Sequence, residues 1–312
     1  MLRNLRAKFK SNQFIYNSYM RAKRIVTGEL LGMTSKNEQD YFAKYGEKLY
    51  SGKGEIVDLG CWLGSTTIPL VAGLLKNPSF TDSRRKVFAY DTFIWSEVMK
   101  DGVAGTNLVG KFKEGDSFLA EYKRRTKKYA DRIEICAGDL KEIGWNGNKI
   151  EFLLVDAMKN WELTSAIVKD FYSSLIPNVS YVLQQDFAHY FTPWIHLLHW
   201  YLRDHFEFKE DIPKASSVVY KYINQIPPEK LDQIYSFDDF SNDDIEKAFD
   251  YSISLVNDEK KANIYAAKVM SFIHQKRFDE ASTCFQAILN QGIPIEKDLA
   301  IVQNLLLDSV PK

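Results

Sequence analysis

Short apolar runs alternate with longer amphipathic stretches between residues 55 and 223. Most of the runs are rich in β-branched or aromatic residues, which is typical of buried parallel strands. They cover 55–60, 86–91, 132–137, 149–156 and 180–185. The stretches between them have helical spacing and lie near 64–76, 115–130, 161–174 and 192–206. Because strands and helices alternate, the pattern predicts an α/β fold with a doubly wound, mostly parallel sheet.

Two further strands are predicted after this alternation, at 206–209 and 216–223, where they form a closing hairpin. The pair Pro227-Pro228 then breaks the pattern and indicates a domain boundary. Beyond it, three segments have helical spacing without strands: 243–256, 260–275 and 278–290. Part of this region resembles one tetratricopeptide repeat, but an array needs about three repeats, so an ordinary helical hairpin is favoured. We therefore expect a helical N-terminal arm (1–50), a sheet domain (51–225) and an acidic helical domain (226–312).

Charge is unevenly distributed along this chain, although its formal net charge is zero. Residues 1–30 hold seven Lys or Arg and one acid, whereas residues 229–260 hold ten acids and three Lys. We expect the basic arm and the acidic segment to pair, within one chain or between the two chains of a homodimer. Leu2, Leu5 and Phe9 stand among the basic residues of the arm, which suits peripheral contact with an anionic membrane surface. Packing of the arm on the protein body is the favoured alternative.

Length and composition exclude several classes of protein. With 312 residues, of which 45% are hydrophobic and 26% charged, the chain has the composition of a globular protein. No apolar run reaches the roughly 18 residues of a transmembrane segment, and the N-terminus lacks the apolar core of a secretion signal. Three Cys without metal-ligand spacing argue against a disulfide framework and a zinc site. We expect a cytoplasmic protein that does not bind nucleic acid, since no nucleic-acid module is recognised.

A strand, a turn and a helix at residues 57–67 carry the first candidate site. Gly60 and Gly64 allow a tight turn and let a ligand approach the backbone. The helix that follows begins with free N–H groups at its positive dipole end. A dinucleotide fingerprint needs a further glycine between these two, where this chain has Trp62. The motif therefore favours a ligand without a pyrophosphate and disfavours a nicotinamide-dependent oxidoreductase.

The motif Asp58-Leu-Gly60-Cys-Trp62-Leu-Gly64 resembles the first motif of class I S-adenosylmethionine-dependent methyltransferases, and within them the macrocin-type sugar O-methyltransferases. Asp91-Thr92-Phe93 is similar to the Asp-Ser-Phe of that family. The resemblance implies a Rossmann-like methyltransferase sheet, S-adenosylmethionine as cofactor, and an Asp91 that accepts hydrogen bonds from the ribose hydroxyls. It also implies a set of cofactor-binding residues in the turn, namely Asp58, Gly60, Trp62, Gly64, Ser65 and Thr66. For Asp139, after the third strand, a contact with the adenine and a helix N-cap remain equal alternatives.

The ends of the fourth and fifth strands carry the candidate catalytic residues. Asp156 and Lys159 have the spacing of metal-dependent O-methyltransferases of the catechol type, where the resemblance implies an Asp that binds Mg²⁺ and a Lys that deprotonates the hydroxyl. Asp186 fits a second ligand position, while Gln185 is neutral where the macrocin type has a carboxylate. A metal site of Asp156, Gln185 and Asp186 is one interpretation. Metal-free catalysis with His189 as general base is the other.

Other polar and aromatic residues have structural explanations beside functional ones. His196 and His199, in an aromatic segment, are interpreted as packing residues. The basic run 123–128 suits an anionic substrate, whereas a solvated helix face is the commoner case. The tryptophans at strand ends suit stacking on a sugar or planar substrate, and core packing explains each of them equally well; they are Trp62, Trp95, Trp161 and Trp194.

The motifs together predict an S-adenosylmethionine-dependent O-methyltransferase that acts on a hydroxyl of a sugar, a glycan or another small molecule. The alternative is an interaction module that has the methyltransferase fold and a degenerate catalytic site. Gln185, Met158 in place of a second acid, and the helical C-terminal region motivate this alternative.

Overall fold

The structure is a computed structural model that describes residues 13–145 and 147–309. The first part of the basic arm, with Leu2, Leu5 and Phe9, therefore lies outside the described residues. Among the residues described, no helix is both long and apolar enough to cross a membrane.

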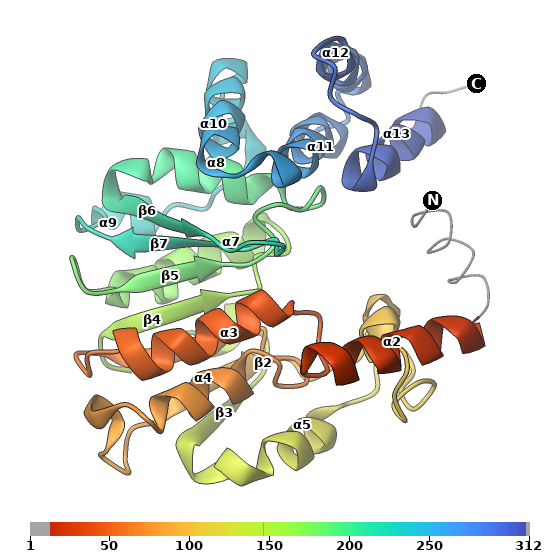
Figure 1. The fold of residues 1–312 in the computed structure, drawn as a ribbon. Coiled ribbons are helices and arrows are strands. Elements are labelled where there is room, and N and C mark those ends of the chain that lie inside the picture. The colour runs from red at the N-terminus through yellow and green to blue at the C-terminus, as the bar shows by residue number, and fades with distance from the viewer. Residues whose placement is uncertain (1–12, 146, 310–312) are drawn as a thin grey trace. The chain divides into compact units, whose positions relative to one another are not determined.

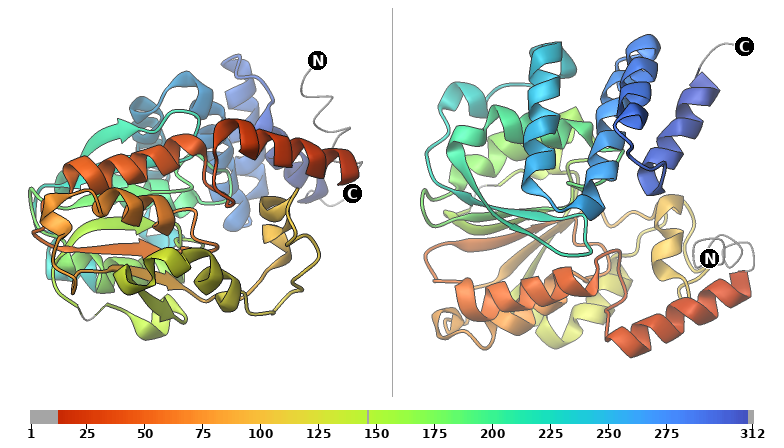
Figure 2. Two further views of the ribbon diagram at one scale, coloured as in Figure 1. Left: turned by 60° about the horizontal axis from the view of Figure 1, so that its bottom comes forward. Right: turned by 45° about the horizontal axis from the view of Figure 1, so that its top comes forward.

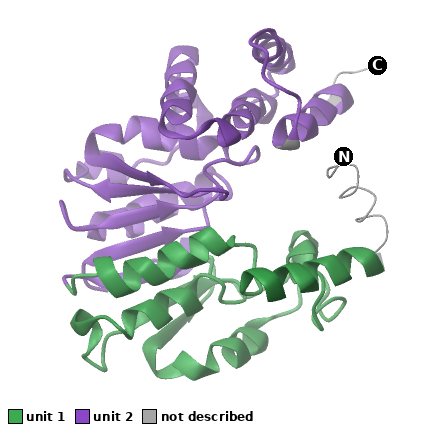
Figure 3. Ribbon diagram, viewed as in Figure 1, with its two compact units in different colours: residues 1–52, 60–139 green, residues 53–59, 140–312 purple. Residues whose placement is uncertain are grey.

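The chain divides into two compact units (Figure 3). The first comprises residues 1–52 and 60–139, and the second comprises 53–59 and 140–312. None of the boundaries between the units coincides with Pro227-Pro228, because the helices that follow these prolines pack on elements of the second unit. The division into an arm, a sheet domain and an acidic helical domain stays a prediction.

The strands form a seven-stranded sheet in the order β3-β2-β1-β4-β5-β7-β6 (Figure 1). Their bounds are β1 Glu55–Leu59, β2 Val87–Asp91, β3 Ile133–Ala137, β4 Ile150–Val155, β5 Tyr181–Gln184, β6 Phe206–Asp211 and β7 Val218–Tyr222. β4 runs parallel to β1 and β5, and β2 runs parallel to β3, whereas β7 is antiparallel to β5 and β6. Every residue of β4 is buried, as expected of a central strand. The predicted mostly parallel sheet with its closing hairpin is confirmed.

The described part of the N-terminal arm is helical, as predicted. The helices of the first unit are α2 Gln13–Thr27, α3 Lys36–Lys44, η1 Tyr45–Leu49, α4 Thr67–Leu74, η2 Pro78–Phe80, η3 Glu97–Val103, α5 Leu119–Thr126 and η4 Lys127–Arg132. α3 begins at a capping box formed by Ser35 and Glu38. α3 and α4 pack closely, because a Cβ at Gly73 would overlap the backbone of Ala43.

The second unit carries the C-terminal helices. Its helices are α6 Leu140–Ile143, α7 Trp161–Asp170, η5 Tyr172–Ser174, α8 Pro193–Tyr201, η6 Arg203–His205, α9 Pro228–Leu231, η7 Phe237–Asp239, α10 Asn242–Leu255, α11 Asp258–His274, α12 Phe278–Asn290 and α13 Lys297–Ser309. α10 and α11 pack against α8, and α12 and α13 pack against α11 (Figure 2). α13 is absent from the elements predicted by the sequence pattern.

A buried ion pair ties α11 to the hairpin of β6 and β7. The Lys260 side chain is only 6% exposed, and its ammonium pairs with Asp211 at the end of β6. It also donates a hydrogen bond to the carbonyl of Ile212 at 2.8 Å. Asp211 accepts the backbone N–H of Asn257, the N-cap residue of α11, at 3.0 Å. The start of α11 is thus bound to the hairpin by both charge and backbone contacts.

His196 and His199 are buried in α8, which confirms their interpretation as packing residues. The ring of His196 lies 4.8 Å from the rings of Phe187 and Phe249, and that of His199 stacks on Tyr220 at 4.3 Å. Burial, with a further contribution from His199, lowers the pKa of His196 to about 3. Burial lowers the pKa of His199 to about 3 as well. Both imidazoles are therefore neutral near pH 7.

Candidate functional site

The turn after β1, called here the glycine loop (residues 60–66), has a left-handed backbone at three positions. The φ angle is 89° at Gly60, 42° at Trp62 and 86° at Gly64. This region suits glycine but costs another residue about 1–3 kcal/mol. The N–H groups of Gly60 and Cys61 both donate to the carbonyl of Tyr90, at 2.8 and 3.1 Å. The loop is thereby fixed to β2, which keeps Trp62 in its strained conformation.

Asp91, the last residue of β2, binds both the glycine loop and the turn that follows β2. Its Oδ2 accepts the backbone N–H of Trp62 at 2.8 Å, and its Oδ1 accepts the backbone N–H of Phe93 at 2.8 Å. The side chain is half-buried, and each carboxylate oxygen can accept more than one hydrogen bond. Two backbone groups therefore fix the orientation of a partly exposed carboxylate, as the binding of a vicinal diol requires.

The indole of Trp62 is enclosed within the first unit. It is 5% exposed, and its ring centroid lies 6.3 Å from that of Trp95. A Cβ at Gly102 would overlap the indole, so only glycine fits there. The Nε1–H of Trp62 is buried without a hydrogen-bond partner among the described residues. Because an unpaired buried donor costs about 1–3 kcal/mol, this N–H is a candidate donor to a bound ligand.

A segment that precedes α3 covers the glycine loop. A Cβ at Gly32 would overlap the hydroxyl of Ser65, so the two backbones approach closely. Arg125 of α5 donates to the carbonyl of Leu63 at 2.9 Å and to that of Leu31 at 3.4 Å. One residue of the basic run 123–128 thus holds the loop and its cover together, while the other four basic side chains in the run are exposed. Sequence reasoning missed Gly32 and Arg125, since each acts on a partner far along the chain.

The remaining residues expected to bind a cofactor stand near strand ends. Asp58 is buried within β1. Thr66 is buried at the N-cap position of α4, where its side chain makes no capping hydrogen bond. Asp139 stands directly between β3 and α6, a position that suits either of its two interpretations. Cofactor contact stays a prediction for all three.

The donors and acceptors of the first unit fit the nucleoside part of S-adenosylmethionine. Asp91 offers an oriented acceptor for ribose hydroxyls. Gly60 and Gly64 present backbone without a Cβ, and Trp62 adds a buried donor that lacks a partner among the described residues. The residue types and their orientation therefore suit the group that the motif implies.

Two predicted catalytic residues, Asp156 and Lys159, form an ion-paired group with Asp186, a predicted metal ligand, called here the carboxylate–lysine cluster. Asp156 follows β4, and Asp186, whose φ angle is 56°, follows β5. The Nζ of Lys159 lies 2.8 Å from Oδ1 of Asp156 and also pairs with Oδ2 of Asp186. The Lys159 side chain is 42% exposed, so it remains accessible to solvent and to a ligand.

The ammonium of Lys159 stays charged in this cluster. Desolvation lowers the pKa of Lys159, but the charges of Asp156 and Asp186 and the hydrogen bonds to them outweigh desolvation and raise it above its ordinary value. A general base must be unprotonated at the working pH. Lys159 in this arrangement therefore serves as a hydrogen-bond donor rather than as a base.

The arrangement does not fit a divalent cation. A metal shared by Asp156 and Asp186 would need both carboxylates, but the Lys159 ammonium is paired with each of them. Buried Gln185 adds only a neutral amide. Mg²⁺ prefers hard oxygen ligands that include carboxylates. Over the described part of the chain, no group of three or more His, Cys, Asp or Glu could hold a metal ion. The two carboxylates instead form ion pairs with the ammonium of Lys159.

His189 lies in the loop after β5, near the carboxylate–lysine cluster. Its side chain is 34% exposed. Its ring lies 4.3 Å from that of Phe191, and the Lys159 ammonium lies 5.7 Å from the same Phe191 ring. The hydroxyl of Thr192 donates to the carbonyl of Asp186 at 2.7 Å, which closes the loop on itself. The His189 imidazole and the Lys159 ammonium thus both lie against the Phe191 ring.

The tryptophans at strand ends are packed within the protein. Trp62, Trp95 and Trp194 are buried. Trp161 stacks on Tyr235 at 6.5 Å and on Phe240 at 5.8 Å. Core packing accounts for their placement, so they supply no support for stacking on a sugar ring.

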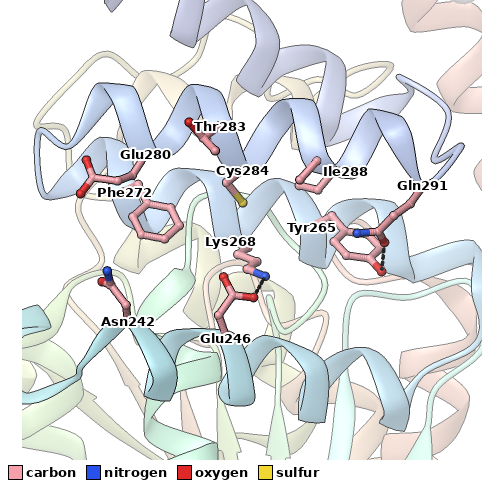
Figure 4. Close-up of a pocket in the computed structure, with 11 residues that line it drawn as sticks. Asn242, Glu246, Tyr265, Lys268, Phe272, Glu280, Thr283, Cys284, Ile288 and Gln291 are labelled. Carbon is pink, nitrogen blue, oxygen red and sulfur yellow. Dashed lines mark hydrogen bonds and ion pairs between the residues drawn. The ribbon is translucent and has the colours of Figure 1, made fainter.

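A hollow of about 360 Å³ lies between α10, α11 and α12 (Figure 4). Lys268 pairs with Glu246 in it, and the hydroxyl of Tyr265 donates to Oε1 of Gln291 at 3.3 Å. None of the candidate catalytic or cofactor-binding residues lines this hollow. It is therefore separate from the candidate site.

Comparison with known proteins gives structural likenesses only. No family model matches the chain, and no curated protein matches its sequence. The chain is similar to the O-methyltransferase NovP, with 16% identity, a TM-score of 0.46, and coverage of 61% of this chain and 81% of NovP. It is similar to the calicheamicin methyltransferase CalS11, with 15% identity, a TM-score of 0.42, and coverage of 59% and 76%. It is also similar to a SAM-dependent O-methyltransferase from Thermotoga maritima, with 14% identity, a TM-score of 0.41, and coverage of 65% of this chain and 71% of that protein.

Proposed function

We propose that this protein is an S-adenosylmethionine-dependent O-methyltransferase. The observation that carries the proposal is the carboxylate of Asp91, which the backbone N–H groups of Trp62 and Phe93 orient at the end of the second strand. Trp62 stands where a dinucleotide site needs glycine, which favours a nucleoside ligand without a pyrophosphate. The sheet order supplies the matching fold.

The first unit would hold the cofactor. When bound, S-adenosylmethionine supplies an electrophilic methyl group on its sulfonium. Asp91 would accept hydrogen bonds from the ribose hydroxyls, and the glycine loop would bind the rest of the nucleoside through its backbone. We propose the macrocin-type subfamily for this chain, because the Trp62 motif and Asp91-Thr92-Phe93 resemble its motifs.

The second unit would bind and activate the acceptor. We assign proton removal from the acceptor hydroxyl to His189, because an accessible imidazole is the side chain most often used as a general base. The Lys159 ammonium has three N–H donors, and Asp156 and Asp186 use two of them. The third N–H would orient the acceptor oxygen. Because the cluster does not fit a divalent cation, we propose that these steps proceed without a metal.

The acceptor we propose is a hydroxylated small molecule or a glycan. The carboxylate–lysine cluster presents charged donors and acceptors, which suit a polyhydroxylated ligand. The neutral Gln185 and the Met158 of the motif leave an interaction module as the rival function. The rival predicts that the protein does not transfer a methyl group to any acceptor.

Calorimetric titration with S-adenosylhomocysteine tests the proposal directly. We expect binding at sub-millimolar concentration and no binding of NAD⁺ at the same concentration. Transfer of labelled methyl groups to a panel of nucleotide sugars, glycans and phenols then identifies the acceptor. Absence of S-adenosylhomocysteine binding by the folded protein would refute the proposed function.

We further propose that α2 rests on an anionic membrane surface. One side of α2 is bound within the first unit, since Asn17 accepts the N–H of Gly105 and Arg24 donates to the carbonyl of Gly102, each at 2.9 Å. The other side exposes apolar side chains: Phe14, Ile15, Tyr19, Ile25 and Val26. An exposed apolar helix face in a segment with seven Lys or Arg among its first 30 residues suits anionic lipid.

A further inference from the structure

Two C-terminal helices hold the loop that carries His189. Asn263 of α11 donates through Nδ2 to the carbonyl of Ala188 at 3.1 Å. Asp298 of α13 accepts the backbone N–H of Tyr190 through Oδ2 at 2.9 Å. These contacts lie on either side of His189 in the chain, so α11 and α13 fix the backbone before and after the proposed base.

The same oxygen of Asp298 faces the imidazole of His189. Oδ2 lies 3.5 Å from Nδ1, and the Asp298 side chain is only 14% exposed. A carboxylate at this distance favours the tautomer with a proton on Nδ1, which leaves Nε2 as the atom that accepts a proton. We infer that Asp298 is a positioning residue that holds the His189 loop and sets the tautomer of His189. The helical region after Pro228 thereby supplies part of the acceptor site.

Few other charged or titratable groups surround His189 among the described residues. Burial and the charge of Asp298 raise the pKa of the Tyr190 phenol, which is therefore neutral near pH 7. The Lys159 ammonium lies against the Phe191 ring, which His189 also contacts. It is already paired with two carboxylates. Asp298 is thus the charged partner whose effect on His189 a single substitution can isolate.

This inference rests on the proposed function, in which His189 is the base, and its test does not need a cofactor or an acceptor. The test is an NMR measurement of the histidine tautomers in the full chain, with His189→Gln to assign the His189 signal. The Asp298→Asn variant keeps an oxygen for the Tyr190 N–H and removes only the charge. Asp308→Asn, an exposed acid on the same helix, is the matched control.

We expect Asp298→Asn to reduce the fraction of neutral His189 imidazole that is protonated at Nδ1. Asp298→Glu should restore part of this fraction, and Asp308→Asn should leave it unchanged. An unchanged tautomer in the folded Asp298→Asn variant would overturn the inference, as would an equal change in Asp308→Asn. If Asp298→Asn does not fold, the native protein still decides, because a neutral His189 protonated mainly at Nε2 excludes the assigned role. Failure of S-adenosylhomocysteine to bind would instead refute the proposed function and leave the His189 tautomer measurement intact.

Discussion

The backbone N–H of Trp62 donates to the carboxylate of Asp91 at 2.8 Å, and this bond joins the glycine loop to the end of β2. The donor belongs to a tryptophan with a left-handed φ of 42°, so the bond both orients the carboxylate and helps to hold a strained residue. The two motifs that suggested a cofactor site are therefore parts of one hydrogen-bonded unit.

Loss of the Asp91 charge should weaken binding of S-adenosylhomocysteine. Hydrogen bonds to a charged group contribute about 1.5–3 kcal/mol each, so we expect Asp91→Asn to raise the dissociation constant roughly 10-fold or more. Glu134→Gln, at an exposed acid on neighbouring β3, is the control that should bind normally. Calorimetry measures both variants, and thermal melting verifies that they are folded. Equal affinities for Asp91→Asn and the native protein would remove Asp91 from the cofactor site.

Removal of the Lys159 ammonium should create a cation site that the native protein lacks. We expect Mn²⁺, followed by electron paramagnetic resonance, to remain unbound by the native protein at millimolar concentration. Lys159→Ala leaves two carboxylates without their shared ammonium and should bind Mn²⁺ measurably. Lys141→Ala, which removes an exposed ammonium paired with Glu162, should behave as the native protein does. Tight Mn²⁺ binding by the native protein would show that Lys159 yields its place to a metal.

The two buried histidines of α8 should make the protein less stable in acid. Their folded pKa of about 3 lies below the ordinary value of 6.5, so between these values the unfolded chain binds more protons than the folded one. The free energy of unfolding therefore has its full value above about pH 6.5, where both histidines are neutral in either state, and it falls as the pH drops toward 3. From pH 7 to pH 5 the free energy of unfolding should fall by on the order of 4 kcal/mol for the pair.

Denaturant titrations at both pH values measure this loss, and the His196→Leu, His199→Leu double variant should lose less stability over the same interval. Burial also lowers the pKa of His205 and of His274, so part of the acid sensitivity should persist in the variant. An unchanged pH dependence in the double variant would contradict the assignment to α8.

The exposed face of α2 should bind vesicles that contain phosphatidylglycerol and should not bind vesicles of phosphatidylcholine alone. Phe14 and Val26 are 80% and 85% exposed, and replacing both with Ser should abolish co-sedimentation. Val98→Ser removes an equally exposed apolar side chain elsewhere in the first unit and should have no effect. A dimer in solution that the double variant dissociates would assign this face to a second copy of the chain and contradict the membrane assignment.

The strands could be predicted because each is a short apolar run with its own local signal. β1 and β4 lie within one or two residues of their predicted bounds. β6 extends to Asp211, beyond the predicted end at residue 209, because a lysine 49 residues further along the chain makes burial of this acid favourable. α13 was missed although Leu299, Val302 and Leu306 are buried at helical spacing, so the local signal was present.

The candidate site was predictable only where its residues are close in sequence or follow neighbouring strands. Asp156 and Lys159 are three residues apart in sequence, and Asp186 follows the adjacent strand, so parallel pairing of β4 and β5 brings all three together. The contact of Asp298 with His189 depends on how α13 packs. Neither residue type nor spacing encodes that packing, which is why sequence reasoning left His189 without a partner.

A protease cut between α9 and α10 should not release the C-terminal helices. Removing one partner of a buried ion pair costs about 3–5 kcal/mol, and the pairing of Lys260 with Asp211 lies between the two fragments. We expect a chain nicked near Phe237 to elute as a single species in gel filtration, and the Lys260→Ala chain to separate after the same cut. Separation of the native fragments would contradict this. A stop codon soon after Pro228 would remove Lys260, the partner of Asp211 in the hairpin of β6 and β7. Late truncations should therefore behave as folding mutations and be degraded by proteases.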